Sequence, residues 1–326
     1  MTVEKLKDDD VELVEKLHVK YAALKRELAK VIVGQEDVIA QTLIAVFSRG
    51  HALLVGVPGL AKTLLIRTLS EVLDLGFRRI QFTPDLLPSD ITGINYYDQK
   101  TTDFIFRRGP IFANIVIADE INRTTPRTQS ALLEAMEERQ VSIDGVTYKL
   151  DEPFFVAATE NPIESQGTFP LPEAQVDRFL MKLSLGYPSP DAEKAILTGH
   201  IIDSPLSGLL PVCTRADIIA AQNEVRRIHV SERIAEYIVR IIHATRDSDR
   251  VRLGVSPRGT LALLHAAQAY AAVEGREYVL PDDVKAVAVP VLAHRIIARS
   301  QSASRITDPS ENIIDYIIDT ISAPIE

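Results

Sequence analysis

The feature that most constrains the fold of this chain is the eight-residue sequence GVPGLAKT at positions 56–63. It follows a short apolar run at 52–55 and precedes a stretch with the apolar spacing of an amphipathic helix. The sequence matches G-x-x-x-x-G-K-[ST], except that Ala61 replaces the second glycine. In such a loop, backbone N–H groups, a helix N-terminus, a lysine and a hydroxyl converge on a phosphate. We therefore expect a buried strand, a phosphate-binding loop and a helix, in that order.

Ala61 is the departure from this loop pattern. Alanine keeps the backbone N–H that a phosphate needs, so the loop can form provided that this residue does not require a positive φ. The predicted phosphate-binding residues are Gly56, Val57, Pro58, Gly59, Leu60, Ala61, Lys62 and Thr63.

Composition and charge narrow the possible partners. A hydrophobic fraction of 46% and a charged fraction of 25% are typical of globular proteins and exclude disorder for most of the chain. Lys and Arg total 36 against 45 Asp and Glu, and the resulting charge of −9 disfavours nucleic acids and anionic membranes. The sequence contains neither a membrane-spanning apolar run nor a signal-peptide hydrophobic segment near its charged N-terminus. We expect a cytoplasmic protein without a nucleic-acid partner and without membrane insertion.

The first half of the chain alternates between two kinds of apolar pattern. Short apolar runs at 79–82, 115–118, 154–159 and 179–185 suit buried strands, and helical patterns such as 126–139 lie between several of them. This alternation predicts an α/β fold with a mostly parallel sheet that is covered on both faces. Two segments with polar turns interrupt this alternation.

Residues 94–109 and 141–150 each have β-rich flanks around a polar turn and are predicted to form hairpins. After residue 187 the chain becomes rich in Ala, Ile and Arg with helical spacing. We therefore expect a nucleotide-binding core at 1–186, which includes an N-terminal helix at about 10–30, and an all-helical domain at 187–326.

A second chemical motif is NIVIADE at 114–120, an apolar run that ends in two acids. Asp119 can hold Mg²⁺ directly or through water beside Thr63, and Glu120 can act as a general base toward water. Two acids after a strand are common in surface turns, but their position 56 residues after Thr63 favours a catalytic interpretation.

Three further polar residues are candidates, and each has a simpler structural alternative. Asn161 could hold a water near a terminal phosphate, although Asn161-Pro162 is also a common turn initiator. Arg178 could stabilise transition-state charge on a neighbouring subunit or could be a helix-end cation. Arg258, in the SPRG sequence at 256–259, could reach a phosphate or could solvate the start of a helix.

These motifs together resemble the MoxR family of AAA+ ATPases. The resemblance extends from about Val33 to the C-terminus and is strongest in GPIFANIVIADEINR, TQSALLEAMEERQVSIDG and ATENPIESQGTFPLPEAQVDRF. It implies an AAA+ αβα core with a P-loop, followed by a helical lid. It also implies that Val33 and Gly34 lie near the adenine, and that Lys62, Thr63, Asp119 and Glu120 serve the phosphates, Mg²⁺ and water. By the same resemblance, Asn161 would be sensor 1, Arg178 the arginine finger and Arg258 sensor 2.

The resemblance further implies an activity. We expect Mg²⁺-dependent ATP hydrolysis between core and lid in a hexameric ring, with Arg178 supplied by the adjacent protomer. The output would be chaperone-like remodelling or maturation of a client protein complex, metal insertion included. Two hairpin inserts would transmit motion, and a protein with a von Willebrand factor A domain would be the partner.

Three other functions remain as alternatives. A nucleotide-gated switch with little turnover is disfavoured by the presence of Glu120, Asn161 and Arg178. A small-molecule kinase would need an acceptor pocket, for which the sequence has no signature. A DNA-directed motor is disfavoured by the acidic charge.

Overall fold

The structure is a computed structural model that describes residues 8–161, 167–199, 208–299 and 309–324. A five-stranded parallel sheet lies at its centre, in the order β2-β5-β8-β1-β9. The strands are β1 (Ala52–Val55), β2 (Phe77–Gln81), β5 (Ile115–Asp119), β8 (Phe155–Glu160) and β9 (Met181–Ser184). The predicted strands and their mostly parallel arrangement are confirmed.

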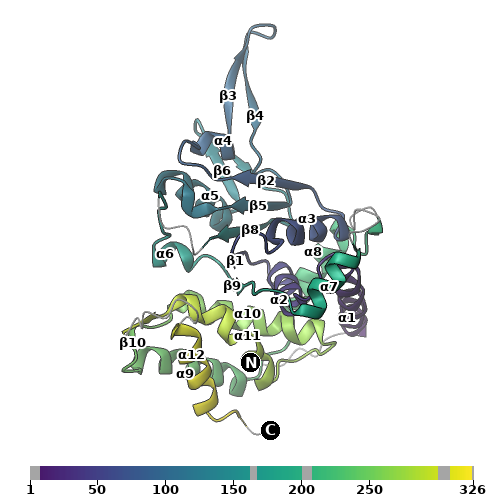
Figure 1. Cartoon of the computed structure of the whole chain (residues 1–326), viewed down its shortest axis with the longest axis vertical. Helices are drawn as coiled ribbons and strands as arrows, with labels where there is room; N and C mark the ends of the chain where they lie inside the picture. Colours follow the sequence, from purple (N-terminus) through teal and green to yellow (C-terminus); the bar gives the residue numbers. More distant parts are fainter. Residues whose placement is uncertain (1–7, 162–166, 200–207, 300–308, 325–326) are drawn as a thin grey trace.

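Side chains alternate between the two faces of this sheet, as the two-residue repeat of a strand requires. Ala52 and Leu54 of β1 face one hydrophobic core, and Leu53 faces the other. The first core is covered by α1 (Asp8–Ala29), α2 (Glu36–Phe47) and α3 (Lys62–Val72), and the second by α4 (Pro88–Thr92) and α5 (Pro126–Glu138). The result is the expected αβα layering (Figure 1).

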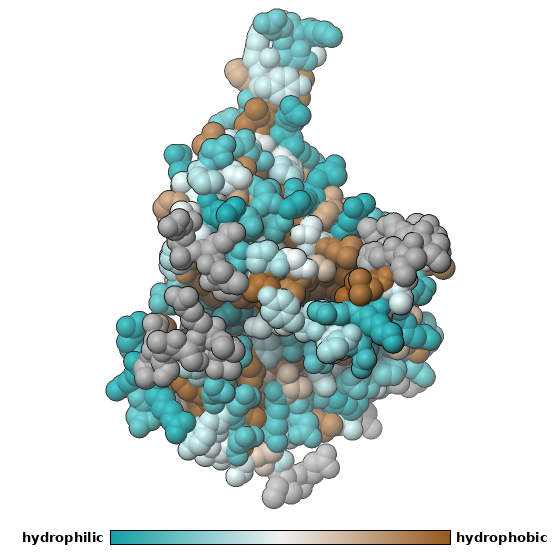
Figure 2. Space-filling model, viewed as in Figure 1, coloured by the Kyte–Doolittle hydropathy of each residue, from teal (hydrophilic) through white to brown (hydrophobic). Residues whose placement is uncertain are grey.

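Both predicted hairpins are present. β3 (Gly93–Asp98) pairs with β4 (Asp103–Arg108), and β6 (Gln140–Ile143) pairs with β7 (Val146–Lys149). The first hairpin stands away from the body of the molecule, as Figures 1 and 2 show. Its base contacts the second hairpin, since the Phe106 and Tyr148 rings stack with centroids 4.2 Å apart.

The short helix α6 (Glu173–Val176) precedes β9, and α7 (Pro190–Gly199) and α8 (Arg215–Val225) follow it at the side of the molecule where α1 and α2 lie (Figure 1). The last four helices form the lid region below the sheet in Figure 1: α9 (Glu232–Asp247), α10 (Pro257–Val273), α11 (Pro281–Leu292) and α12 (Pro309–Thr320). The short 3₁₀ turns η1 (Ile121–Arg123) and η3 (Ala293–Arg295) follow β5 and α11. Within the described residues, no helix is long and apolar enough to cross a membrane.

The helical region also contains a small antiparallel sheet. β10 (Val251–Leu253) pairs with β11 (Ile297–Ala298), and this pair joins the end of α9 to the segment after η3. Strands of two and three residues are too short to show an alternating pattern in the sequence, so they were not predicted.

The lid is attached to the sheet by a polar joint before β9. Arg295, whose side chain is 2% exposed, donates hydrogen bonds to the Asp177 and Phe179 carbonyl oxygens at 2.7 and 2.6 Å and pairs with the Asp177 carboxylate. Asp177 also accepts a hydrogen bond from Ser256 Oγ, the N-cap of α10, at 3.0 Å. A buried guanidinium needs such partners, because an unpaired buried charge is costly. The segment 177–180 is thus fixed to both α10 and η3.

A buried histidine, His51, directly precedes β1 and forms hydrogen bonds with strand β8 and helix α5. His51 Nδ1 accepts the Val156 N–H at 3.0 Å, and Nε2 donates to the Met136 carbonyl oxygen at 3.1 Å. Burial, with a further contribution from the Arg139 charge, lowers the pKa of His51 to about 3. The ring is therefore neutral in the folded protein.

The lowered pKa of His51 predicts that the free energy of unfolding depends on pH. The unfolded chain binds a proton at His51 below pH 6.5, the ordinary value, but the folded protein does not until about pH 3. Because the folded pKa is the lower one, the free energy of unfolding falls as pH falls below 6.5, by up to about 1.4 kcal/mol per pH unit for this group. Urea unfolding of His51→Gln between pH 6.5 and 5 should show a shallower slope. A slope equal to that of the wild type would contradict the assignment.

Candidate functional site

A cavity of about 390 Å³ lies at the carboxyl ends of the central strands. It is lined by Pro58, Gly59, Leu60, Ala61, Lys62, Thr63, Leu64, Asp119, Glu120, Thr159 and Asn161. The loop after β1, the acids that end β5 and the amide after β8 meet here because the three strands are parallel neighbours. The sequence predicted each of these groups separately, and the structure brings them to one place.

The loop between β1 and α3 has two residues with left-handed backbone. Gly59 has φ +87°, as glycine allows, and Ala61 has φ +58°. The condition placed on Ala61, that it need not adopt a positive φ, is therefore not met. A left-handed L-residue costs about 1–2 kcal/mol, so the loop carries strain at the residue that directly precedes α3.

Lys62, the first residue of α3, points its ammonium group back across the loop. Nζ donates to the carbonyl oxygens of Gly56, Val57 and Glu160. Burial lowers the pKa of Lys62, while the charges of Asp119 and Glu120 raise it. An anion bound in this cavity would replace backbone carbonyls as the partner of this lysine.

Thr159 fixes both acids at the end of β5. Its hydroxyl donates to Asp119 Oδ1 at 2.7 Å and accepts the backbone N–H of Glu120 at 2.8 Å. Both Asp119 and Thr159 are buried, with exposed fractions of 8% and 1%. The other carboxylate oxygen of Asp119 accepts from Arg79 Nη2 at 2.7 Å and from Thr63 Oγ1 at 3.3 Å.

Glu120 turns toward the cavity through an unusual backbone conformation, with φ +58°. Its Oε2 accepts a hydrogen bond from Gln81 Nε2 at 3.0 Å and lies 3.3 Å from Arg123 Nη1. Strained residues of this kind concentrate at functional sites, where the surroundings enforce them. Here the contacts with Thr159, Gln81 and Arg123 hold Glu120 in this conformation.

The donor set suits Mg²⁺. A carboxylate oxygen of Asp119 and the Thr63 hydroxyl lie side by side at the cavity, and Mg²⁺ takes oxygen ligands, commonly one or two from the protein and the rest from phosphates and water. Thr63 and Asp119 would hold the ion, and phosphate and water oxygens would supply its other ligands.

Val33 and Gly34 lie beside the chain that leads from β9 into the lid. Gly34 has φ +74°, and a Cβ there would approach within 2.7 Å of Ala192 Cβ at the start of α7. Gln35 Nε2 donates to the Gly186 carbonyl oxygen at 2.9 Å. These contacts place Gly34 and Gln35, with Val33 next to them in the chain, between α2 and the start of α7, beyond the carboxyl end of β9.

Arg178 and Arg258 do not line the cavity that contains the phosphate-binding loop. Arg178 precedes β9, so it is at the amino ends of the parallel strands, while the phosphate-binding loop is at their carboxyl ends. Both arginines pair with one carboxylate, that of Glu137 in the last turn of α5. Figure 1 shows α3 and α6 on opposite sides of the view. The chain therefore does not bring these arginines to its own phosphate cavity.

Several contributing residues were missed by the sequence analysis. Gln81 and Arg79 occupy exposed positions of β2, where polar residues are ordinary, and Thr159 belongs to an apolar run. Glu137 is one of several acids on α5. The only signal that could have found them is their place on strands and helices adjacent to the motifs.

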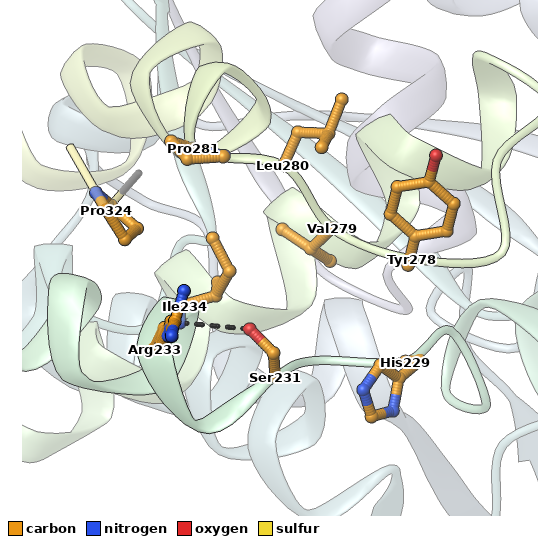
Figure 3. A pocket seen from close by; sticks show the side chains of 9 residues that line it. All are labelled: His229, Ser231, Arg233, Ile234, Tyr278, Val279, Leu280, Pro281 and Pro324. Atoms are coloured by element: carbon orange, nitrogen blue, oxygen red, sulfur yellow. Dashed lines mark hydrogen bonds between the residues drawn. The ribbon is translucent and has the colours of Figure 1, made fainter. Parts of the chain in front are cut away.

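A second cavity, of about 230 Å³, lies within the lid and contains none of the predicted site residues. Figure 3 shows it between the start of α9 and the segment before α11, with Val279, Leu280 and Pro281 on one wall. Ser231, the N-cap of α9, accepts the Ile234 N–H across its floor at 3.3 Å. The lining is mostly apolar and offers no catalytic arrangement.

The left-handed alanine gives a testable consequence for stability. Ala61→Gly should raise the free energy of unfolding by about 1 kcal/mol, because glycine removes the strain at φ +58°. Gly59→Ala provides the reverse control, since its φ is +87° while a new Cβ would meet nothing within 4 Å. Chemical denaturation without nucleotide measures both. A lower stability for Ala61→Gly would show that the backbone is not strained there.

The Thr159 hydroxyl can be tested in the same way. Thr159→Val should lower the free energy of unfolding by about 2–4 kcal/mol, since the Glu120 N–H and the Asp119 carboxylate lose a buried partner. Thr159→Ser keeps the hydroxyl and should cost only about 1 kcal/mol. Equal losses in the two variants would mean that packing, and not hydrogen bonding, accounts for this threonine.

Comparison with known proteins agrees with this geometry. Residues 51–181 match the family model described as "ATPase family associated with various cellular activities (AAA)", and residues 243–315 match an AAA lid domain. A crystal structure from Cytophaga hutchinsonii ATCC 33406, of a protein assigned provisionally as an ATPase, superposes with a TM-score of 0.87 at 39% identity. The superposition covers 96% of this chain and 98% of that one.

Sequence relatives span nearly the whole chain. The uncharacterised protein YeaC of Bacillus subtilis (strain 168) is 47% identical over 96% of this chain and 97% of its own length. Chaperone MoxR1 of Mycobacterium tuberculosis is 41% identical over 91% of this chain and 81% of its own, and protein MoxR of Paracoccus denitrificans is 32% identical over 94% and 97%. The chain is therefore a member of the MoxR family of AAA+ ATPases.

Proposed function

We propose that this protein hydrolyses Mg²⁺-bound ATP at a site shared between two subunits of a ring and uses the energy to remodel a client protein. The observation that carries this proposal is the separation of Arg178 and Arg258 from the phosphate cavity of their own chain. A phosphate cavity whose described lining includes Lys62 but no arginine, and a chain that presents two arginines at the other end of the sheet, fit a head-to-tail assembly.

The chemical step follows from the cavity residues. Lys62 and the loop N–H groups bind the β- and γ-phosphates, and Asn161 positions the attacking water. Glu120 accepts a proton from that water as it attacks the γ-phosphorus, and the bond to the β-phosphate oxygen breaks. When bound, Mg²⁺ at Thr63 and Asp119 would neutralise charge on the phosphates.

Arg178 completes this site from the neighbouring subunit in our proposal. An arginine that reaches transition-state charge from another chain is worth about 10³–10⁵ in rate. Hydrolysis would then depend on assembly. We propose the core at 1–186 and the lid at 187–326 as the two moving parts, with Val33 and Gly34 beside the adenine between them.

The client would be engaged by the projecting β3–β4 hairpin. Tyr97 and Phe104 form an aromatic pair near its end, with centroids 5.4 Å apart and exposed fractions of 53% and 69%. Exposed aromatic side chains on a protruding element are suited to apolar segments of another protein. The contact of Asn95 with Asp144, at 2.7 Å, joins this hairpin to the one that follows α5.

The finer assignments come from the family resemblance. We propose a hexamer as the ring, maturation of a protein complex or insertion of its metal as the outcome, and a von Willebrand factor A domain protein as the partner. Chaperone MoxR1 supports the chaperone-like part by its name.

A complementation assay tests the shared site. Glu120→Gln should lose at least about 10²-fold in ATP turnover and Arg178→Ala about 10³-fold, because they remove the general base and the trans cation. Mixed in equal amounts with exchange of subunits, they should recover about a quarter of wild-type activity, since a quarter of the interfaces pair an intact Glu120 with an intact Arg178. Phosphate release against protein concentration is the measurement.

The outcomes separate the alternatives. Turnover that is independent of protein concentration, or absence of recovery in the mixture, would rule out the trans role of Arg178. Tight ATP binding by the wild type with no repeated turnover would favour the nucleotide-gated switch. Phosphate transfer to an acceptor in place of phosphate release would indicate a kinase.

A further inference from the structure

The two arginines that we place at the subunit boundary share a carboxylate that no motif singles out. Glu137 Oε2 lies 3.1 Å from Arg178 Nε, and Glu137 Oε1 pairs with Arg258 Nη2. Each guanidinium has five N–H donors, so one contact to Glu137 leaves others for an anion brought by a neighbouring chain. One carboxylate oxygen for each arginine is the arrangement that holds two cations side by side.

The backbone around these arginines is already fixed by other groups. Asp177 and Ser256 tie the segment before β9 to the N-terminus of α10, and Arg295 holds the Phe179 carbonyl oxygen from below. The two guanidinium groups are partly exposed, with side-chain exposed fractions of 31% for Arg178 and 44% for Arg258. What the backbone leaves undetermined is the direction of these long side chains, and Glu137 is the group that contacts both.

Electrostatics also requires such a group. Two like charges that contact the same carboxylate repel each other, and each arginine side chain has rotamer entropy that the binding of a phosphate would otherwise have to remove. The Glu137 carboxylate offsets one of the two charges and restricts both side chains before a phosphate arrives. Preorganisation of this kind increases rate without a new contact to the substrate.

We propose that Glu137 is a positioning residue that aligns Arg178 and Arg258 as one unit toward the nucleotide of the adjacent subunit. This inference rests on the proposed function, since it assumes a nucleotide site completed in trans. Glu137 does not touch the nucleotide. It acts through the two arginines, on the side of the subunit that donates them.

The test is a kinetic comparison of Glu137→Gln with the wild type. Misplacement of a catalytic group by about 1 Å can cost 10²-fold, so kcat should fall about 10–100-fold while KM for ATP changes less than about twofold. Glu137→Asp, which keeps the charge but has a shorter reach, should fall in between. Glu138→Gln, a charge-removing change at the next residue of α5, is the matched control and should behave as the wild type.

Mixtures of variant subunits show whether the Glu137→Gln defect lies on the arginine side or on the Glu120 side of the subunit boundary. Glu137→Gln mixed equally with Glu120→Gln should recover about a quarter of wild-type activity, because the Glu120→Gln subunits supply correctly held arginines to intact Glu120 sites. Glu137→Gln mixed with Arg178→Ala should gain nothing, since both are defective on the arginine side. Recovery in the first mixture also shows that Glu137→Gln folds and assembles.

The results distinguish this inference from the proposed function. If Arg178→Ala and Glu120→Gln complement each other but Glu137→Gln retains or exceeds wild-type kcat, the positioning role is wrong and the shared site stands. The same conclusion follows if Glu137→Gln is impaired but Glu120→Gln does not rescue it. If Arg178→Ala and Glu120→Gln fail to complement, the shared site itself is wrong.

Discussion

The position of β1 between β8 and β9, parallel to both, is the constraint on which the other features depend. Its register sets Ala52 opposite Ala157 and Met181, so the carboxyl ends of the three strands finish at the same edge. The phosphate-binding loop follows β1 at that edge, and Thr159 and Asn161 come from β8 beside it. The amino end of β9, where Arg178 lies, is necessarily at the other edge. His51 secures the arrangement by bonding β1 to β8 and α5.

Sequence reasoning was most successful where a structural element depends on residues that are close in the chain. The strand and loop at 52–63, the strand that ends in Asp119 and the two hairpins were predicted because each is a local pattern in the sequence. It was less successful where contact depends on packing between distant segments. Gln81 reaches Glu120 across 39 residues, and Arg258 reaches Glu137 across 121. Composition and periodicity do not reveal either contact, because exposed polar residues are common on any strand or helix.

Ala61 shows a different limit. The sequence suggested that alanine could replace glycine in the loop if its φ stayed negative, and in the structure the φ of Ala61 is positive. The protein accepts about 1 kcal/mol of strain at this position, and Glu120 carries a comparable conformation on the opposite wall of the cavity. Positive φ values also occur at five other described non-glycine residues, in turns and at helix ends, so it is the shared cavity that sets Ala61 and Glu120 apart. Glu120 donates its backbone N–H to the Thr159 hydroxyl, and Ala61 directly precedes α3.

The polar joint before β9 has a mechanical consequence for the lid. The lid is tied to the sheet covalently after β9, at the carboxyl edge, and by Asp177, Ser256 and Arg295 at the amino edge. The helices α10 and α11 also pack on α1, α2 and β9, so one hydrophobic core continues from the sheet into the lid. Arg178 directly follows Asp177, and Arg258 lies two residues after Ser256, so both arginines flank the polar joint. A shift of α10 against the segment before β9 would therefore also change the position of one arginine relative to the other.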